Sequence, residues 1–174
     1  MTISCFDLFN DGIFAAIAAI GFASISNPSS RSYFSCALLA AVGHIVRFIL
    51  LHYGLHLTLA SFAAGLSIGT LAIPLSAWKR CPAEGLSFPA LLPMIPGKYA
   101  YGSIQALLEC LGNSQEQEFQ HYFYLLQHNW LTCTLTILMM VVGVTIPLFT
   151  FRNHGLNVLL RMRRKVHSSS SLLL

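Results

Sequence analysis

The sequence predicts an all-α membrane protein, a polytopic helix bundle with about five transmembrane helices, one of them broken by proline and glycine. Hydrophobic residues make up 55% of the 174 residues and charged residues only 9%, whereas soluble domains carry about a quarter charged residues. So few charges cannot cover a water-facing surface, and a lipid bilayer fits this composition. Helices are expected because backbone groups facing lipid must be paired internally.

Five apolar segments come close to the length of about 20 residues that crosses a bilayer. The first ends at Asn27-Pro28, and no Lys or Arg precedes Arg31, so it lacks the basic start of a cleaved signal peptide and is expected to be a retained helix. The segments are approximately 6–26, 33–51, 57–78, 88–110 and 130–151.

The basic residues lie in alternate connections between these segments. Arg31 follows the first segment, Lys79 and Arg80 follow the third, and Arg152 follows the fifth, whereas 112–129 holds two Glu and no Lys or Arg. The positive-inside rule then favours five spans with a cytoplasmic C-terminus. We expect a transmembrane transporter domain over 1–153 and a basic cytoplasmic tail over 154–174, whose positive charge suits anionic lipid and not nucleic acid.

The stretch 115–127 has two interpretations that the sequence leaves open. Phe119, Tyr122, Phe123 and Leu126 recur at helical spacing, with Gln and Glu between them. The stretch is either a separate amphipathic turn at the membrane interface or the wet extension of the fifth helix.

The fourth segment contains the strongest functional signal. Pro93 and Pro96 remove backbone donors and clash with the preceding turn, and Gly97 permits backbone angles that other residues avoid. We expect a half helix, a break, and a second helix that starts near Gly97. Such breaks at membrane depth face protein or a watery cavity, and the free amides of a helix N-terminus bind anions such as a substrate carboxylate.

Side chains beside the break could assist. Lys98 either helps to hold an anionic group or extends to the membrane interface, and Tyr101 either donates to the same ligand or is an interface aromatic. Glu109, at the end of the segment, is either a proton-coupling carboxylate or an outer-edge charge.

A second cluster, Gly43-His44-x-x-Arg47, lies in the second segment. His44 and Arg47 are three residues apart and share one helical face. Four apolar residues follow Arg47, which places it inside the span, where a charge needs a partner. The partner could be Glu109, Asp11, an acid of another chain, the substrate or a backbone group. His44 could relay protons or make a helix-to-helix hydrogen bond, and Asp11 is assigned only to the dipole of the first helix.

Two further observations limit the function. Gly65-x-x-x-Gly69 predicts close packing of the third helix against another helix. No Walker loop, nucleophile elbow or zinc-binding HExxH occurs in the sequence, so we expect no enzyme activity, no cofactor and no metal site.

These residues together resemble the threonine/serine exporter family in its short, split form. The resemblance runs from about Asp11 to Arg152 and rests on Gly43-His44-x-x-Arg47, on 62–69 and on Leu92-Pro-Met-Ile-Pro-Gly97 followed by Tyr101. It implies a multi-pass protein of the bacterial inner membrane. It also implies a larger five-span partner with a cytoplasmic N-terminal region, and proton-coupled export of small carboxylates or amino acids such as succinate, threonine or serine.

On this interpretation, Arg47, Pro93, Pro96, Gly97, Lys98 and Tyr101 bind substrate, and His44 and Glu109 couple transport to protons. A different class of function, a membrane scaffold that stabilises a partner without transporting anything, is the alternative. In that case, substitution of Arg47 or Lys98 should alter assembly and leave substrate affinity unchanged.

Overall fold

The computed structural model describes the backbone of residues 5–26, 32–79, 81–112 and 115–170. Within these ranges, side chains are described from Phe6 to Phe151 except Asp7 and Ser26. The described chain is helical and contains no strand, which confirms the all-α prediction. Its elements are α1 (Cys5–Ser26), α2 (Tyr33–His52), α3 (Leu57–Lys79), α4 (Ala83–Leu91), the 3-10 turn η2 (Leu92–Met94), α5 (Gly97–Gly112) and α6 (Glu116–Ser170).

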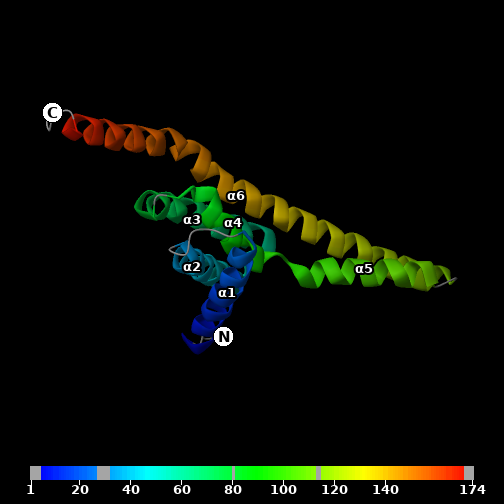
Figure 1. Cartoon of the computed structure of the whole chain (residues 1–174). Coiled ribbons are helices and arrows are strands. Elements are labelled where there is room, and N and C mark those ends of the chain that lie inside the picture. The colour runs from blue at the N-terminus through cyan, green and yellow to red at the C-terminus, as the bar shows by residue number, and fades with distance from the viewer. Residues whose placement is uncertain (1–4, 27–31, 80, 113–114, 171–174) are drawn as a thin grey trace.

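The helices form a bundle from which one helix pair projects. Helices α1 to α4 lie together, while α5 and the N-terminal part of α6 run side by side away from them (Figure 1). Alanines dominate the buried core, including Ala19, Ala23, Ala40, Ala64 and Ala72, all fully buried. Side chains this small let helix backbones approach one another closely, as is typical of helix packing inside membranes.

Helices α3 and α6 make the closest contact of this kind. A Cβ atom placed on Gly65 would lie 2.6 Å from the carbonyl oxygen of Met140, and one on Gly69 would lie 2.6 Å from that of Val144. Gly143 of α6 lies in the same way against the carbonyl oxygen of Phe62. The predicted close packing at Gly65 and Gly69 is therefore confirmed, with α6 as the partner helix.

Four single helices are long and apolar enough to cross a membrane, counted over the described residues. They are 8–25 of α1, α2, α3, and 116–151 of α6. The first three agree with the predicted segments within a few residues. The fourth predicted segment is divided among α4, η2 and α5, so the predicted broken helix is present in the structure.

Helix α6 is longer than the predicted fifth segment, 130–151. It begins at Glu116, so the stretch 115–127 extends this helix and is not a separate interfacial turn. The 36 residues from Glu116 to Phe151 have a length of about 54 Å at 1.5 Å per residue, well over the hydrocarbon thickness of about 30 Å. The far end of the α5–α6 pair must therefore lie outside the hydrocarbon unless the pair is strongly tilted.

The C-terminal half of α6 crosses the boundary that we predicted at 153–154 without a change of secondary structure. The side chains of the basic residues from Arg152 onward lie outside the described residues. The basic cytoplasmic tail over 154–174 therefore stays a prediction.

Candidate functional site

The break between α4 and α5 leaves a backbone carbonyl without its helical partner. Ile95 precedes Pro96 and is extended, with φ −57° and ψ 128°, as steric contact with a following proline requires. The extended residue turns the chain out of the helix, so the Met94 carbonyl receives no hydrogen bond from the α5 backbone. An unpaired carbonyl away from water costs about 1–3 kcal/mol, so a substitute donor is expected.

Arg47 of α2 supplies that donor. Its Nη1 donates to the Met94 carbonyl oxygen at 2.6 Å, and the side chain is half-buried. The structure thus answers which partner Arg47 has within this chain: a backbone carbonyl at the break. Glu109, another candidate partner, lies 12 residues beyond Gly97, about 18 Å along the axis of α5.

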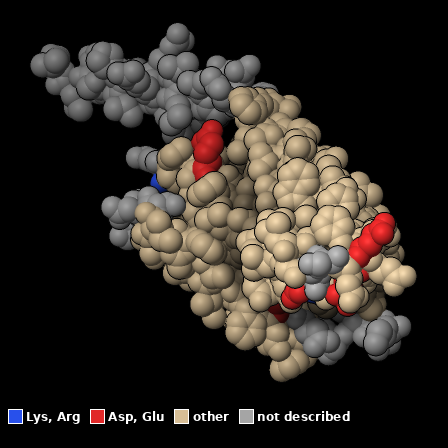
Figure 2. Space-filling model, turned by 90° about the vertical axis from the view of Figure 1, so that its right-hand side faces the viewer, with Lys and Arg blue, Asp and Glu red and all other residues tan. Residues whose placement is uncertain are grey.

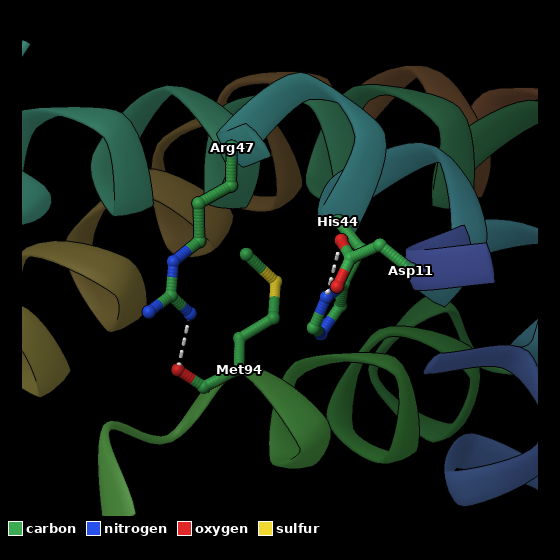
Figure 3. Close-up of polar contacts among 4 residues, drawn as sticks. All are labelled: Asp11, His44, Arg47 and Met94. Atoms are coloured by element: carbon green, nitrogen blue, oxygen red, sulfur yellow. Dashed lines mark hydrogen bonds and ion pairs between the residues drawn. The ribbon is translucent and has the colours of Figure 1, made fainter. Parts of the chain in front are cut away.

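Most N–H groups of the Arg47 guanidinium are not used by the bond to Met94. The guanidinium carries five N–H groups, and the bond from Nη1 to Met94 is the hydrogen bond that the structure shows for it. The other end of the guanidinium points away from Met94 (Figure 3). Asp11 of α1 and Tyr99 of α5 are near enough to interact with Arg47 electrostatically. A planar fork with free donors is the geometry that binds a carboxylate in bidentate fashion.

Asp11 and His44 form a hydrogen bond beside the Arg47 guanidinium, which becomes an ion pair when the imidazole is protonated. Oδ2 of Asp11 lies 3.2 Å from Nδ1 of His44, and the two residues come from α1 and α2. The Met94 side chain lies between this pair and Arg47 (Figure 3). His44 therefore makes the helix-to-helix contact that was one of its two predicted roles, and that contact leaves the proton-relay role open.

The other ring nitrogen of His44 is buried and makes no hydrogen bond of normal geometry within the described chain, although the Pro93 backbone is near enough to interact with the imidazole. Nε2 is one of four such side-chain atoms among the described residues, and the other three are hydroxyl oxygens of Ser35, Ser61 and Thr136. A buried polar atom without a hydrogen bond is unusual in a folded protein, and an unseen water or ligand commonly explains it. His44 thus presents an unused proton-binding atom beside Asp11.

Asp11 was named as a possible partner of Arg47, but its bond to His44 was not predicted and no functional role was given to it. The sequence analysis placed it at the N-terminal dipole of the first helix, whereas α1 begins at Cys5, so Asp11 lies in its second turn. The available signal was its place inside the apolar window 8–25. A carboxylate in a span is costly and generally faces the protein interior with a partner.

The N-terminus of α5 offers fewer free amides than we expected. The amides of Gly97, Tyr99 and Ala100 donate to the carbonyls of Ile95 and Pro96 at 2.8–3.3 Å. Among the first four residues of α5, the amide of Lys98 alone has no acceptor within the described chain. The prolines and Gly97 therefore create the break, while most of the capacity to hold an anion comes from Arg47.

Lys98, Tyr101 and Glu109 are not part of the cluster around Arg47. All three are exposed along α5, which carries them away from the bundle. Acidic side chains gather around the projecting end of the α5–α6 pair, on a surface otherwise almost free of charge (Figure 2). The exposed acids in this part of the chain are Glu109, Glu116 and Glu118, so the outer-edge interpretation of Glu109 agrees with its position.

Known proteins resemble the chain in sequence. A family profile described as "Threonine/Serine exporter, ThrE" matches residues 11–150. An uncharacterised protein of Haemophilus influenzae is 37% identical over 109 residues, which are 63% of this chain and 37% of the relative. The chain thus spans little more than a third of that relative's length. No solved structure matches it. Among the described residues, no group of three or more His, Cys, Asp or Glu could hold a metal ion.

Proposed function

Because the chain belongs to the threonine/serine exporter family, we propose that it is the small subunit of a proton-coupled secondary exporter. The exported molecules are small carboxylates or amino acids, with threonine, serine and succinate as the candidate substrates. The chain is a multi-pass membrane protein of exporter type. The observation that carries the proposal is the guanidinium of Arg47, held at a helix break inside the membrane domain with donors left over.

The substrate carboxylate is proposed to bind the free N–H groups of Arg47. The bond to Met94 orients the guanidinium, so less side-chain entropy is lost when the anion arrives. Pro93, Pro96 and Gly97 contribute by holding the break open, and the Lys98 amide can donate to the same anion. When the substrate leaves, the Met94 carbonyl keeps one donor of Arg47 occupied.

Proton coupling is assigned to Asp11 and His44. The buried Nε2 of His44 accepts the incoming proton, and the Asp11 carboxylate stabilises the resulting imidazolium. The proton thereby adds positive charge beside Arg47. A substrate anion and a proton therefore influence each other through the same small cluster, which is the basis of coupling in this proposal.

Asp11→Asn tests that assignment. The amide keeps a hydrogen-bonding oxygen for His44 but removes the charge, so we expect efflux driven by a proton gradient to fall at least about tenfold, the effect of 1.4 kcal/mol, while exchange of labelled for unlabelled substrate continues. Both rates are measured in the same membrane vesicles. Glu116→Gln, at the exposed start of α6, is the control and should change neither rate. If Asp11→Asn reduced efflux and exchange equally, Asp11 would not take part in proton coupling.

A second membrane chain is proposed to complete the transporter. The chain would insert in the bacterial inner membrane with its C-terminus in the cytoplasm, as the alternating basic connections favour. Rocking of the two subunits would then expose the site at Arg47 to each side in turn. The larger relative from Haemophilus influenzae is consistent with this chain being one part of a larger unit.

The proposal is tested by efflux from cells preloaded with labelled threonine or labelled succinate. Efflux is expected when this chain and the larger subunit are expressed together, and not with either alone. The preferred substrate is the one with the larger difference between the paired and single expression strains. Full efflux by this chain alone would show that the two-chain proposal is wrong.

A further inference from the structure

Helix α5 has three distinct faces. Ser103, Ala106 and Cys110 are buried, and α6 packs along this helix, where a Cβ placed on Gly102 would lie 2.9 Å from the side-chain nitrogen of Asn129. A second face is apolar and exposed, and consists of Ile104, Leu107, Leu108 and Leu111.

The third face is a polar stripe. It consists of Lys98, Tyr101, Gln105 and Glu109, all of them exposed. At 3.6 residues per turn these four positions fall within a sector of roughly 80°, next to the apolar face. The polar side chains of α5, other than Ser103 and Tyr99, therefore share one narrow face of the helix. This face runs from the break to the projecting end of α5.

Hydrocarbon cannot be the environment of this stripe. Ionisable and amide side chains within membrane helices face protein or water-filled cavities, and a lipid-facing surface is available on the separate apolar face. The stripe also begins at Lys98, one residue after Gly97, so its inner end lies at the break. Its position suits a water-filled path between the break and the outer end of the α5–α6 pair.

We propose that the polar stripe of α5 is the wall of the outward half of the export path, and that Gln105 is a contact residue for the substrate on that path. This inference rests on the function proposed above. Lys98 at the inner end attracts the carboxylate, Tyr101 and Gln105 offer hydrogen bonds to a polar substrate, and Glu109 at the outer end repels the anion and favours its release.

The open side of the stripe faces the second membrane chain. Two copies of this chain inserted in the same direction and meeting at α5 across a two-fold axis along the membrane normal would set Lys98 against Lys98 and Glu109 against Glu109, which is unfavourable. A different chain with an acidic group opposite Lys98 avoids that repulsion.

The test is the reactivity of single cysteines toward small charged thiol reagents. Each stripe position is replaced by Cys in a background in which the natural cysteines are changed to Ser, and the two chains are expressed together. Ile104→Cys and Leu111→Cys on the apolar face are the matched controls. Reaction rates are measured in membrane vesicles with an anionic and a cationic methanethiosulfonate, with and without saturating threonine or succinate.

We expect all four stripe positions to react, and substrate to slow the reaction at Tyr101→Cys and Gln105→Cys at least about fivefold without slowing it at the controls. The anionic reagent should react faster than the cationic one at Tyr101→Cys, which is three residues from Lys98 and eight from Glu109, and Lys98→Gln should reduce that preference.

Unreactive stripe positions, or substrate protection that is equal on both faces, would overturn the inference. The preference for the anionic reagent is measured without substrate. It therefore tests the charge along the stripe even if the proposed substrates are wrong. A disulfide-linked pair of this chain through Gln105→Cys would show that a second copy covers the stripe, and would also overturn the inference.

Discussion

Arg47→Ala is expected to reduce efflux of the exported carboxylate or amino acid at least about tenfold. The substitution removes a charged donor, and a hydrogen bond to a charged group contributes about 1.5–3 kcal/mol, where 1.4 kcal/mol corresponds to a factor of ten. It also leaves the Met94 carbonyl without the donor that it has at 2.6 Å. Efflux is measured from preloaded cells and divided by the amount of protein in the membrane.

Two companion variants separate transport from assembly. Arg47→Lys keeps the charge but lacks the planar fork, so an intermediate efflux rate is expected. Lys79→Ala removes a cation that lies over the Trp78 ring at the end of α3, away from the break in sequence, and should leave efflux unchanged. Normal substrate affinity together with poor assembly of Arg47→Ala would favour the scaffold function instead.

Gly65→Ala is expected to have the largest effect on stability. The new methyl group would lie 2.6 Å from the carbonyl oxygen of Met140, and a backbone atom cannot rotate away as a side chain can. Helices α3 and α6 would have to separate, and inserting a methyl group into such close packing costs about 1–3 kcal/mol. The midpoint of thermal unfolding, measured on the purified protein in detergent, should fall.

The matched control is Gly21→Ala in α1. A Cβ on Gly21 has no atom within 4 Å among those that it could meet, and alanine favours a helix by about 1 kcal/mol over glycine. The unfolding midpoint of this variant should be equal to or slightly above that of the wild type. Equal midpoints for Gly65→Ala and Gly21→Ala would show that the close contact between α3 and α6 does not stabilise the protein.

The spans and the break could be predicted because both follow from local rules. Apolar length determines where a helix can cross, and Pro93, Pro96 and Gly97 interrupt helical hydrogen bonding whatever surrounds them. The start of α6 could not be read in this way. The pattern over 115–127 fitted both a separate interfacial turn and an extension of the fifth helix, and what decides between them is contact with α5, as at Gly102 and Asn129.

The site could be predicted only in part, because its contacts join distant segments. The spacing of His44 and Arg47 indicated a shared face, but their partners, Asp11 and the Met94 carbonyl, are 33 and 47 residues away. The sequence cannot indicate which backbone carbonyl accepts a hydrogen bond, because every residue has one. Asp11 was named as a possible partner of Arg47, but its bond to His44 was not predicted because its position was taken as the helix start.

The most direct test of the account is equilibrium binding of labelled threonine and labelled succinate to the purified two-chain complex, with wild-type protein and with Arg47→Gln. Glutamine carries no charge, and because its side chain is two atoms shorter than that of arginine it also loses the bond to the Met94 carbonyl. If Arg47 holds the substrate carboxylate at the break, the dissociation constant should rise at least about tenfold in a complex that still unfolds cooperatively, with only the small fall in unfolding midpoint expected for one lost hydrogen bond. An unchanged dissociation constant in a well-folded Arg47→Gln complex would contradict the account.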